Sequence, residues 1–153
     1  MKIIKSNDNG KGCRIGIVVS EFNDYITKRL LDACLDELKK LKVAEKNITV
    51  VWVPGAFEIP LIALKLAEKK NIDAVICLGA IVKGETLHYE LVANENARGI
   101  GNVSLMTGKP VIFEVLSADT MELVEKRAQV NGYNKGTEAA QAAVQMIGIM
   151  KEI

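Results

Sequence analysis

The sequence predicts an α/β protein with three layers, α/β/α, in which a parallel sheet of four strands is covered by helices on both faces. Four β-rich segments alternate with segments of helical periodicity, which is typical of parallel strands joined by right-handed crossovers. One β-rich segment, residues 74–78, is apolar without interruption, as expected for a strand buried on both faces. We expect one domain over residues 1–153, with residues 1–12 as an N-terminal arm.

The first predicted strand covers residues 13–19, and a helix follows a short polar loop. Asn23 or Asp24 is suited to cap that helix, because short polar side chains accept hydrogen bonds from the free amides of a first turn. Apolar residues then recur at three- and four-residue spacing, which indicates a helix with one face packed on the sheet. These residues are Ile26, Leu30, Cys34, Leu38 and Leu41.

The second predicted strand, residues 48–53, is rich in β-branched side chains and ends at Pro54-Gly55. Pro60 suits the first turn of the next helix, where its missing amide hydrogen does no harm. We expect that helix to continue to about Lys70.

The helix after the third strand, which we expect to end near Met106, is polar over much of its surface. Gly99 and Gly101 each destabilise a helix by roughly 0.5–1 kcal/mol relative to alanine. A helix of this composition is expected to be either fully solvated or packed against another chain across a hydrated interface.

The fourth predicted strand covers residues 110–116. Asp119 is expected to cap a short helix that ends near Ala128, and a last helix begins at about Asn134. Four strands leave an exposed sheet edge, and an N-terminal strand at Ile3-Ile4, contributed to or from a neighbouring chain, would help to cover it.

Composition and charge exclude several function classes. The 153 residues are 49% hydrophobic and 25% charged, with a formal net charge of +1 and no basic cluster. These values favour neither nucleic-acid binding nor attachment to an anionic membrane. No apolar run approaches the roughly 18 residues of a membrane-spanning helix, and the N-terminus lacks the apolar block of a signal peptide.

Cysteine and histidine usage argues against a metal site. Cys13, Cys34 and Cys77 match neither a disulfide framework nor the CxxC spacing of metal ligands. We interpret them as reduced packing residues of a cytoplasmic protein. No glycine-rich nucleotide motif is present, and we expect no cofactor.

Parallel sheets bind ligands at the carboxyl ends of their strands, where four predicted loops meet. The loops are residues 20–23, 54–58, 79–88 and 116–119. Phe22, Phe57 and Phe113 near this edge could form a sandwich for a flat heterocycle. Stapling of the following helices, or core packing for Phe113, is the simpler interpretation of each aromatic residue by itself.

The third loop carries the best candidates for chemistry. Gly84-Glu85-Thr86, at a predicted helix start, offers free amides and the positive end of a helix dipole to a phosphate or an oxyanion. His88 is the only histidine, so proton transfer near neutral pH falls to it. Arg127 and Lys135 are by default solvated charges, although an arginine that reaches the anion seat of a neighbouring subunit would bind phosphate through paired hydrogen bonds.

Several segments in register carry a family resemblance. They are Ser20-Glu21-Phe22-Asn23, Val53-Pro54-Gly55-Ala56-Phe57-Glu58-Ile59-Pro60, Gly79-Ala80-Ile81-Val82-Lys83-Gly84-Glu85-Thr86 with His88, and Asn134-Lys135-Gly136 with Glu138-Ala139-Ala140. Together they resemble the 6,7-dimethyl-8-ribityllumazine synthase family from about residue 12 to the end. The resemblance implies a single lumazine synthase domain with a flavodoxin-like sheet of order 2-1-3-4 and an N-terminal edge strand shared with a neighbouring subunit.

The resemblance also implies an activity in riboflavin biosynthesis. The family condenses 5-amino-6-(D-ribitylamino)uracil with 3,4-dihydroxy-2-butanone 4-phosphate, releasing phosphate and water without a cofactor. Matching positions would bind the aminouracil at Phe22, Ala56, Phe57, Glu58, Ala80, Ile81, Val82 and, from the adjacent subunit, Phe113. The phosphate would be held by Glu85, Thr86 and, from the adjacent subunit, Arg127, with Lys135 and Glu138 in support. His88 would transfer protons.

The resemblance further implies a homo-oligomer built of pentamers: a single pentamer, a pair of pentamers (a decamer), or a sixty-subunit shell that can enclose riboflavin synthase. The chain departs from the family pattern at Leu87, Tyr89, Glu114 and in the loop around Asn131. Strand alternation predicts that the Glu114 side chain points away from the Phe113 face.

Two other classes of protein remain as alternatives. One is a flavodoxin-like binding or signalling module, although residues 20–22 lack a phosphate-cradling Ser/Thr-Gly loop and the third and fourth strands lack a phospho-acceptor aspartate. The other is a non-catalytic shell or flavin-storage protein.

Overall fold

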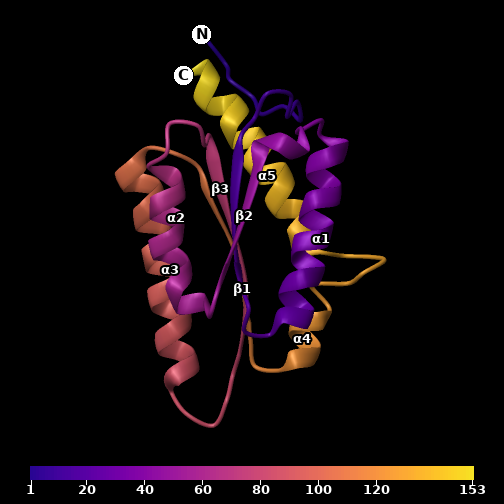
Figure 1. Ribbon diagram of the computed structural model, residues 1–153, viewed down its shortest axis with the longest axis vertical. Helices are drawn as coiled ribbons and strands as arrows, with labels where there is room; N and C mark the ends of the chain where they lie inside the picture. Colours follow the sequence, from indigo (N-terminus) through magenta and orange to yellow (C-terminus); the bar gives the residue numbers. More distant parts are fainter.

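The computed structural model describes all 153 residues and has three layers (Figure 1). The sheet contains four parallel strands in the order β2-β1-β3-β4. Their bounds are β1 Ile15–Ser20, β2 Ile48–Val53, β3 Ala74–Val82 and β4 Val111–Ala118. The predicted fold class, parallel pairing and strand order are confirmed.

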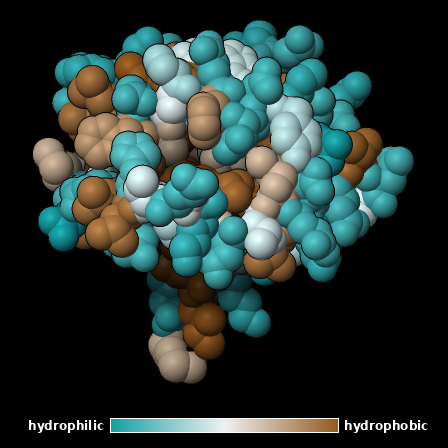
Figure 2. All heavy atoms as spheres, turned by 90° about the horizontal axis from the view of Figure 1, so that it is seen from below, coloured by the Kyte–Doolittle hydropathy of each residue, from teal (hydrophilic) through white to brown (hydrophobic).

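Helices cover both faces of the sheet. One face carries α2 (Ile59–Ala67) and α3 (His88–Thr107), and the other carries α1 (Asp24–Lys40), α4 (Met121–Glu125) and α5 (Lys135–Glu152). Since the strands all run downwards in Figure 1, their carboxyl ends share the lower end of the molecule. Figure 2 views that end and shows hydrophobic side chains interspersed among hydrophilic ones.

The core consists of two apolar clusters, one on each side of the sheet, because successive strand side chains point to opposite faces. Ile17 and Ile76 belong to the cluster under α1 and α5, whereas Val18 and Val75 belong to the cluster under α2 and α3. β3 is buried along almost its whole length, as its apolar sequence predicted. All three cysteines are buried free thiols.

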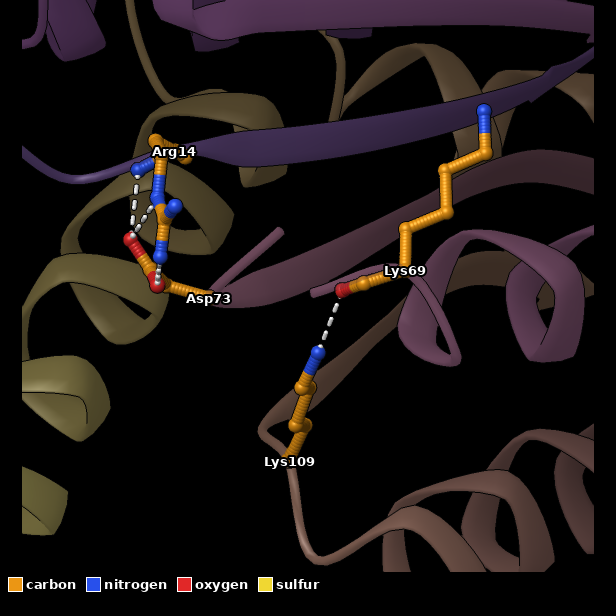
Figure 3. A network of polar contacts seen from close by, with 4 residues as sticks. All are labelled: Arg14, Lys69, Asp73 and Lys109. Carbon is orange, nitrogen blue, oxygen red and sulfur yellow. Dashed lines mark hydrogen bonds and ion pairs between the residues drawn. The ribbon is translucent and has the colours of Figure 1, made fainter. Parts of the chain in front are cut away.

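One ion pair and several hydrogen bonds join the elements at the amino ends of the strands (Figure 3). The carboxylate of Asp73 accepts hydrogen bonds from the backbone N–H of Arg14 at 2.9 Å and from its Nη2 at 2.6 Å. Lys109 Nζ donates to the carbonyl of Lys69 at 2.7 Å. Burial alone would raise the pKa of Asp73, but the Arg14 hydrogen bonds outweigh it and hold that pKa below its ordinary value. The predicted ligand loops lie at the other end of the molecule.

One predicted helix cap is correct in position only, and the other is wrong. Asn23 occupies the N-cap position of α1, but its side chain makes no cap hydrogen bond, and Asp24 is already the first helical residue. α4 is capped by Thr120, whose Oγ1 accepts from Leu123 N at 3.3 Å, and not by Asp119. At α1 the side chain of Asn23 donates to the carbonyl of Ala80 instead, and at α4 the neighbouring polar residue Thr120 takes the position expected for Asp119.

Some predicted boundaries also differ. α2 ends at Ala67, three residues before Lys70, and α4 ends at Glu125 instead of near Ala128. The sequence of these helix ends remains compatible with a helix, so the boundary is set by tertiary packing and turns.

Residues 1–14 form no strand within the chain. They lie beside α5, where Lys2 Nζ donates to the carbonyl of Glu152 and Gln145 Nε2 donates to Asp8 Oδ1, each at 2.8 Å. The edge strand predicted at Ile3-Ile4 is therefore absent from the chain's own sheet. Its pairing with a neighbouring subunit stays a prediction.

The outer face of α3 is uncovered within the chain. Asn94, Arg98 and Asn102 are exposed there, together with the apolar Leu91 and Leu105. No helix of the chain combines the length and apolar character that crossing a bilayer requires.

Candidate functional site

A cavity of about 810 Å³ opens at the carboxyl ends of the strands. The loops after β1, β2 and β3 form it together with the first turns of α3, whereas the loop after β4 contributes nothing. The lining residues are Phe22, Pro54, Gly55, Ala56, Phe57, Glu58, Ala80, Ile81, Val82, Gly84, Thr86, His88, Tyr89, Leu91, Val92 and Glu95. The edge of the sheet at which a ligand site was expected therefore holds a cavity large enough for a small organic molecule.

Two aromatic side chains at this cavity are unusually exposed. Phe22 is 71% exposed and Phe57 is 60% exposed, although the strand ends that precede them, Ser20 and Val53, are buried. A ring that staples a helix would be buried against that helix, so the stapling interpretation does not account for either residue. Exposed rings on neighbouring loops at one cavity suit the binding of a flat ligand.

The loop that carries Phe22 is held by the backbone of the loop after β2. Glu21 N donates to the carbonyl of Val53 at 2.8 Å, and Phe22 N donates to the carbonyl of Pro54 at 3.1 Å. These bonds extend the β1–β2 ladder beyond the last paired residues and bring Phe22 next to the Pro-Gly turn.

The turn that carries Phe57 is held from α3. A short 3-10 turn, Ala56–Glu58, leads directly into α2, and the side-chain amide of Asn96 donates to the carbonyl of Ala56. Asn96 is only 1% exposed, and its Oδ1 has no hydrogen-bond partner. A buried amide in this position fixes the turn because the alternative is an unpaired donor in the core.

The β3–α3 loop differs from its prediction. α3 begins at His88, so Gly84-Glu85-Thr86 precede the helix and do not form its first turn. Thr86 Oγ1 accepts a hydrogen bond from His88 N at 3.3 Å. None of the amides of residues 84–87 donates a hydrogen bond within the chain. These exposed N–H groups beside His88 can donate hydrogen bonds to an anionic ligand, even though the helix begins a few residues later in the chain than predicted.

His88 is exposed and lines the cavity. Leu91, Val92 and Glu95 line it as well, and sequence reasoning missed all three. Their spacing from His88 is i+3, i+4 and i+7, which places them on one helical face. That periodicity, counted from the histidine, is the signal that could have found them.

A second group of predicted residues lies outside this cavity. Arg127 is exposed, and its Nη1 donates to the carbonyl of Leu123 at 2.8 Å. Lys135 N donates to the carbonyl of Arg127 at 2.8 Å, which brings the start of α5 next to this arginine. Arg127, Lys135 and Glu138 therefore lie on the α4–α5 side of the chain and are not brought to Phe22 and His88.

A charged cluster forms where β4 meets α5. Lys135 Nζ lies 2.5 Å from Glu138 Oε2. Burial raises the pKa of Glu114 to about 7; the charge of Lys135 opposes that shift and the charge of Glu138 adds to it. The hydrogen bond to Glu138 is the main cause of a raised pKa for Lys135.

Phe113 and Glu114 occupy opposite faces of β4, as strand alternation predicted. Val115 packs in the cluster under α2 and α3, and Leu116 packs in the cluster under α1 and α5. By the same alternation Phe113 faces the α2–α3 side and Glu114 faces α5. Phe113 is 44% exposed, so it is not the core residue that the simpler interpretation expected.

The chain matches the model of a known protein family. A family model described as 6,7-dimethyl-8-ribityllumazine synthase matches residues 12–151 of the chain. The matched range includes the whole sheet, the cavity and the second group of residues around Arg127.

Proposed function

The chain belongs to the 6,7-dimethyl-8-ribityllumazine synthase family, and from this we propose how its residues divide the work of the reaction. The protein is a transferase of riboflavin biosynthesis. It condenses 5-amino-6-(D-ribitylamino)uracil with 3,4-dihydroxy-2-butanone 4-phosphate and releases phosphate and water.

The aminouracil binds in the cavity, with its ring at Phe22 and Phe57. The support for this assignment is the cavity of about 810 Å³ with two exposed aromatic rings on its walls. Stacking of a flat ring on these side chains would remove apolar surface from water and orient the ring. Ala56, Glu58, Ala80, Ile81 and Val82 complete the walls and contact the ring edges and the ribityl chain.

The phosphate of the second substrate binds at the β3–α3 loop through the amides of Glu85 and Thr86. Support comes from the run of amides that have no acceptor within the chain and from their position beside the cavity. Backbone donors suit a phosphate because they need no change of protonation.

His88 transfers protons between the two substrates. The reaction includes attack of an amine on a carbonyl, elimination of phosphate and ring closure. Each of these steps transfers protons, and without a protein group water would have to donate or accept them. His88 follows the phosphate-binding loop directly and lines the aminouracil cavity. It therefore lies near the binding sites of both substrates. Alignment of two substrates in one cavity supplies a further part of the acceleration.

The site is completed by an adjacent subunit, which contributes Phe113 and Arg127, with Lys135 and Glu138 in support. Within one chain these residues lie outside the cavity, and Phe113 and Arg127 are exposed. A guanidinium from a neighbour would add paired charged hydrogen bonds to the backbone donors of the phosphate site. The chains assemble as pentamers through the exposed face of α3, and pentamers can associate further into a sixty-subunit shell around riboflavin synthase.

We also propose that the enzyme works in the cytoplasm. The three cysteines are free thiols buried in the core, which suits a reducing compartment.

The direct test of this function mixes both substrates with the purified protein and follows the fluorescence of the lumazine product. We expect product formation that depends on both substrates and is lost when Phe22 and Phe57 are both replaced by alanine. Tight flavin binding without product would instead identify a storage protein. Sedimentation velocity on the same sample distinguishes single pentamers, decamers and shells.

A further inference from the structure

In the loop after β1, the side chain of Asn23 takes a hydrogen-bonding position beyond the last paired residues of β1 and β3. β1 pairs with β3 as far as Val19 opposite Leu78, whereas β3 itself runs on to Val82. Beyond Leu78 the carbonyls of β3 that point towards β1 have no backbone partner on that side. Asn23 Nδ2 supplies one, donating to the carbonyl of Ala80 at 2.9 Å.

The backbone of Asn23 makes this contact possible. Its φ of 60° and ψ of 42° lie in the left-handed region, which few residues other than glycine adopt and which asparagine tolerates best. This conformation turns the chain from β1 into α1 and returns the side chain to the sheet. The position thus requires both a left-handed backbone and a side-chain donor, and asparagine supplies the two together.

Phe22 lies between two fixed points. On one side its own amide donates to the carbonyl of Pro54 at 3.1 Å, and on the other side the next residue, Asn23, is fixed to Ala80. Ala80 is itself a cavity residue and begins the wall that continues through Ile81 and Val82. The Asn23 contact therefore joins the loop of one wall to the backbone of another.

We propose that Asn23 is a positioning residue for the aminouracil pocket: its side-chain amide sets the place of the Phe22 ring relative to the wall that begins at Ala80. This inference rests on the proposed binding of the aminouracil at Phe22. Asn23 does not line the cavity and takes no part in proton transfer; it acts through Phe22 and Ala80.

Two substitutions separate the contact from the backbone conformation. Asn23→Asp keeps the size of the side chain and replaces the donor with an oxygen that repels the Ala80 carbonyl. Asn23→Gly keeps the left-handed backbone without strain and removes the side chain entirely. Lys42→Ala is the matched control, because Lys42 is the other non-glycine residue with a positive φ, 69°, and it lies outside the cavity lining.

The experiment measures aminouracil binding by titration and steady-state kinetics for both substrates on the assembled protein, with melting temperatures as a check on folding. For Asn23→Asp and Asn23→Gly we expect aminouracil binding to weaken by about tenfold, the effect of one lost hydrogen bond. The KM for the aminouracil should rise in parallel, while the KM for the butanone phosphate and kcat change little. Lys42→Ala should bind like the unaltered protein.

Three results would overturn the inference. If the Asn23→Gly variant binds the aminouracil as well as the unaltered protein does, the Asn23–Ala80 hydrogen bond does not position the Phe22 ring. A fall in kcat with both KM values unchanged, together with a lower melting temperature, shows a purely structural residue. If Phe22→Ala also binds normally, the pocket assignment itself is wrong, a result distinct from normal binding by the Asn23 variants alone.

Discussion

Gly99 of α3 lies directly against Pro60 of α2: a Cβ at position 99 would be only 2.8 Å from Cβ and from Cγ of the proline ring. Atoms of this kind do not approach so closely, so the two helices can pack at this distance only because position 99 has no side chain. α2 follows the turn of Phe57, and α3 begins at His88, so the contact also fixes the distance between two walls of the cavity.

Gly99→Ala is expected to destabilise the protein by about 1–3 kcal/mol, because the added methyl group forces the helices apart. This loss exceeds the gain of roughly 0.5–1 kcal/mol that alanine brings to a helix interior. Urea unfolding measures the difference. Gly101→Ala is the matched control, since a Cβ there meets nothing within 4 Å in the chain. Equal stability of the two variants would contradict the packing argument.

His88→Ala is expected to slow lumazine formation by at least about tenfold at saturating substrates, because a positioned proton carrier contributes that much or more. The variant should keep its melting temperature, since the side chain is exposed. Glu90→Ala, an exposed residue of the same first turn, serves as the control. An unchanged rate in His88→Ala would remove the histidine from the mechanism.

Arg127→Ala is expected to lower kcat/KM for the butanone phosphate by at least about tenfold, the loss of a charged hydrogen bond to phosphate. Initial rates at varied phosphate substrate give this value. Lys126→Ala removes a neighbouring exposed charge that pairs with Glu122, and it should have little effect. Equal kinetics for the two variants would refute the phosphate role of Arg127.

Mixing two impaired variants tests whether neighbouring subunits share a site. When Phe22→Ala and Arg127→Ala chains are unfolded together and reassembled, some interfaces combine an intact Phe22 with an intact Arg127 from the next chain. We therefore expect activity above that of either variant alone. Activity that equals the mean of the two homogeneous samples would show that each chain carries a complete site.

The sequence predicted the fold from local patterns, and it failed where distant segments decide the outcome. The apolar run of residues 74–78 predicted a buried strand because periodicity depends only on neighbouring residues. The side-chain amide of Asn23 instead donates to the carbonyl of Ala80, 57 positions away. The sequence does not indicate that this contact competes with a helix cap. Likewise, Phe113 lies on an edge strand, and its exposure depends on where the sheet ends.

Leu105→Asp is expected to dissociate the assembly without unfolding the chain. Leu105 is 86% exposed on the uncovered face of α3, and a charge in an apolar contact between chains would be desolvated without a partner. Sedimentation velocity reports the mass. Ala44→Asp places the same charge at an exposed turn away from α3 and should leave the mass unchanged. An intact assembly in Leu105→Asp would exclude this face as the interface.

The Glu114 carboxyl makes stability depend on pH in an unusual direction. Burial raises its pKa from an ordinary 4.5 to about 7, against the charge of Lys135 and with that of Glu138. At a pH below the ordinary pKa of 4.5, the carboxyl is protonated in both the folded and the unfolded chain, so it does not lower the free energy of unfolding. As the pH rises from there to about 7, the unfolded chain ionises first and the folded state loses relative stability. Above that range the full penalty is present.

Glu114→Gln should therefore be more stable than the unaltered protein at pH 8, by about 1–3 kcal/mol, and the gain should shrink towards pH 4. Urea unfolding at several pH values measures both curves. Glu138→Gln provides a control of opposite sign: the Lys135 hydrogen bond holds the pKa of Glu138 below its ordinary value, so its contribution is present at pH 8 and lost in acid. Parallel curves for Glu114→Gln and the unaltered protein would show that Glu114 ionises equally in both states.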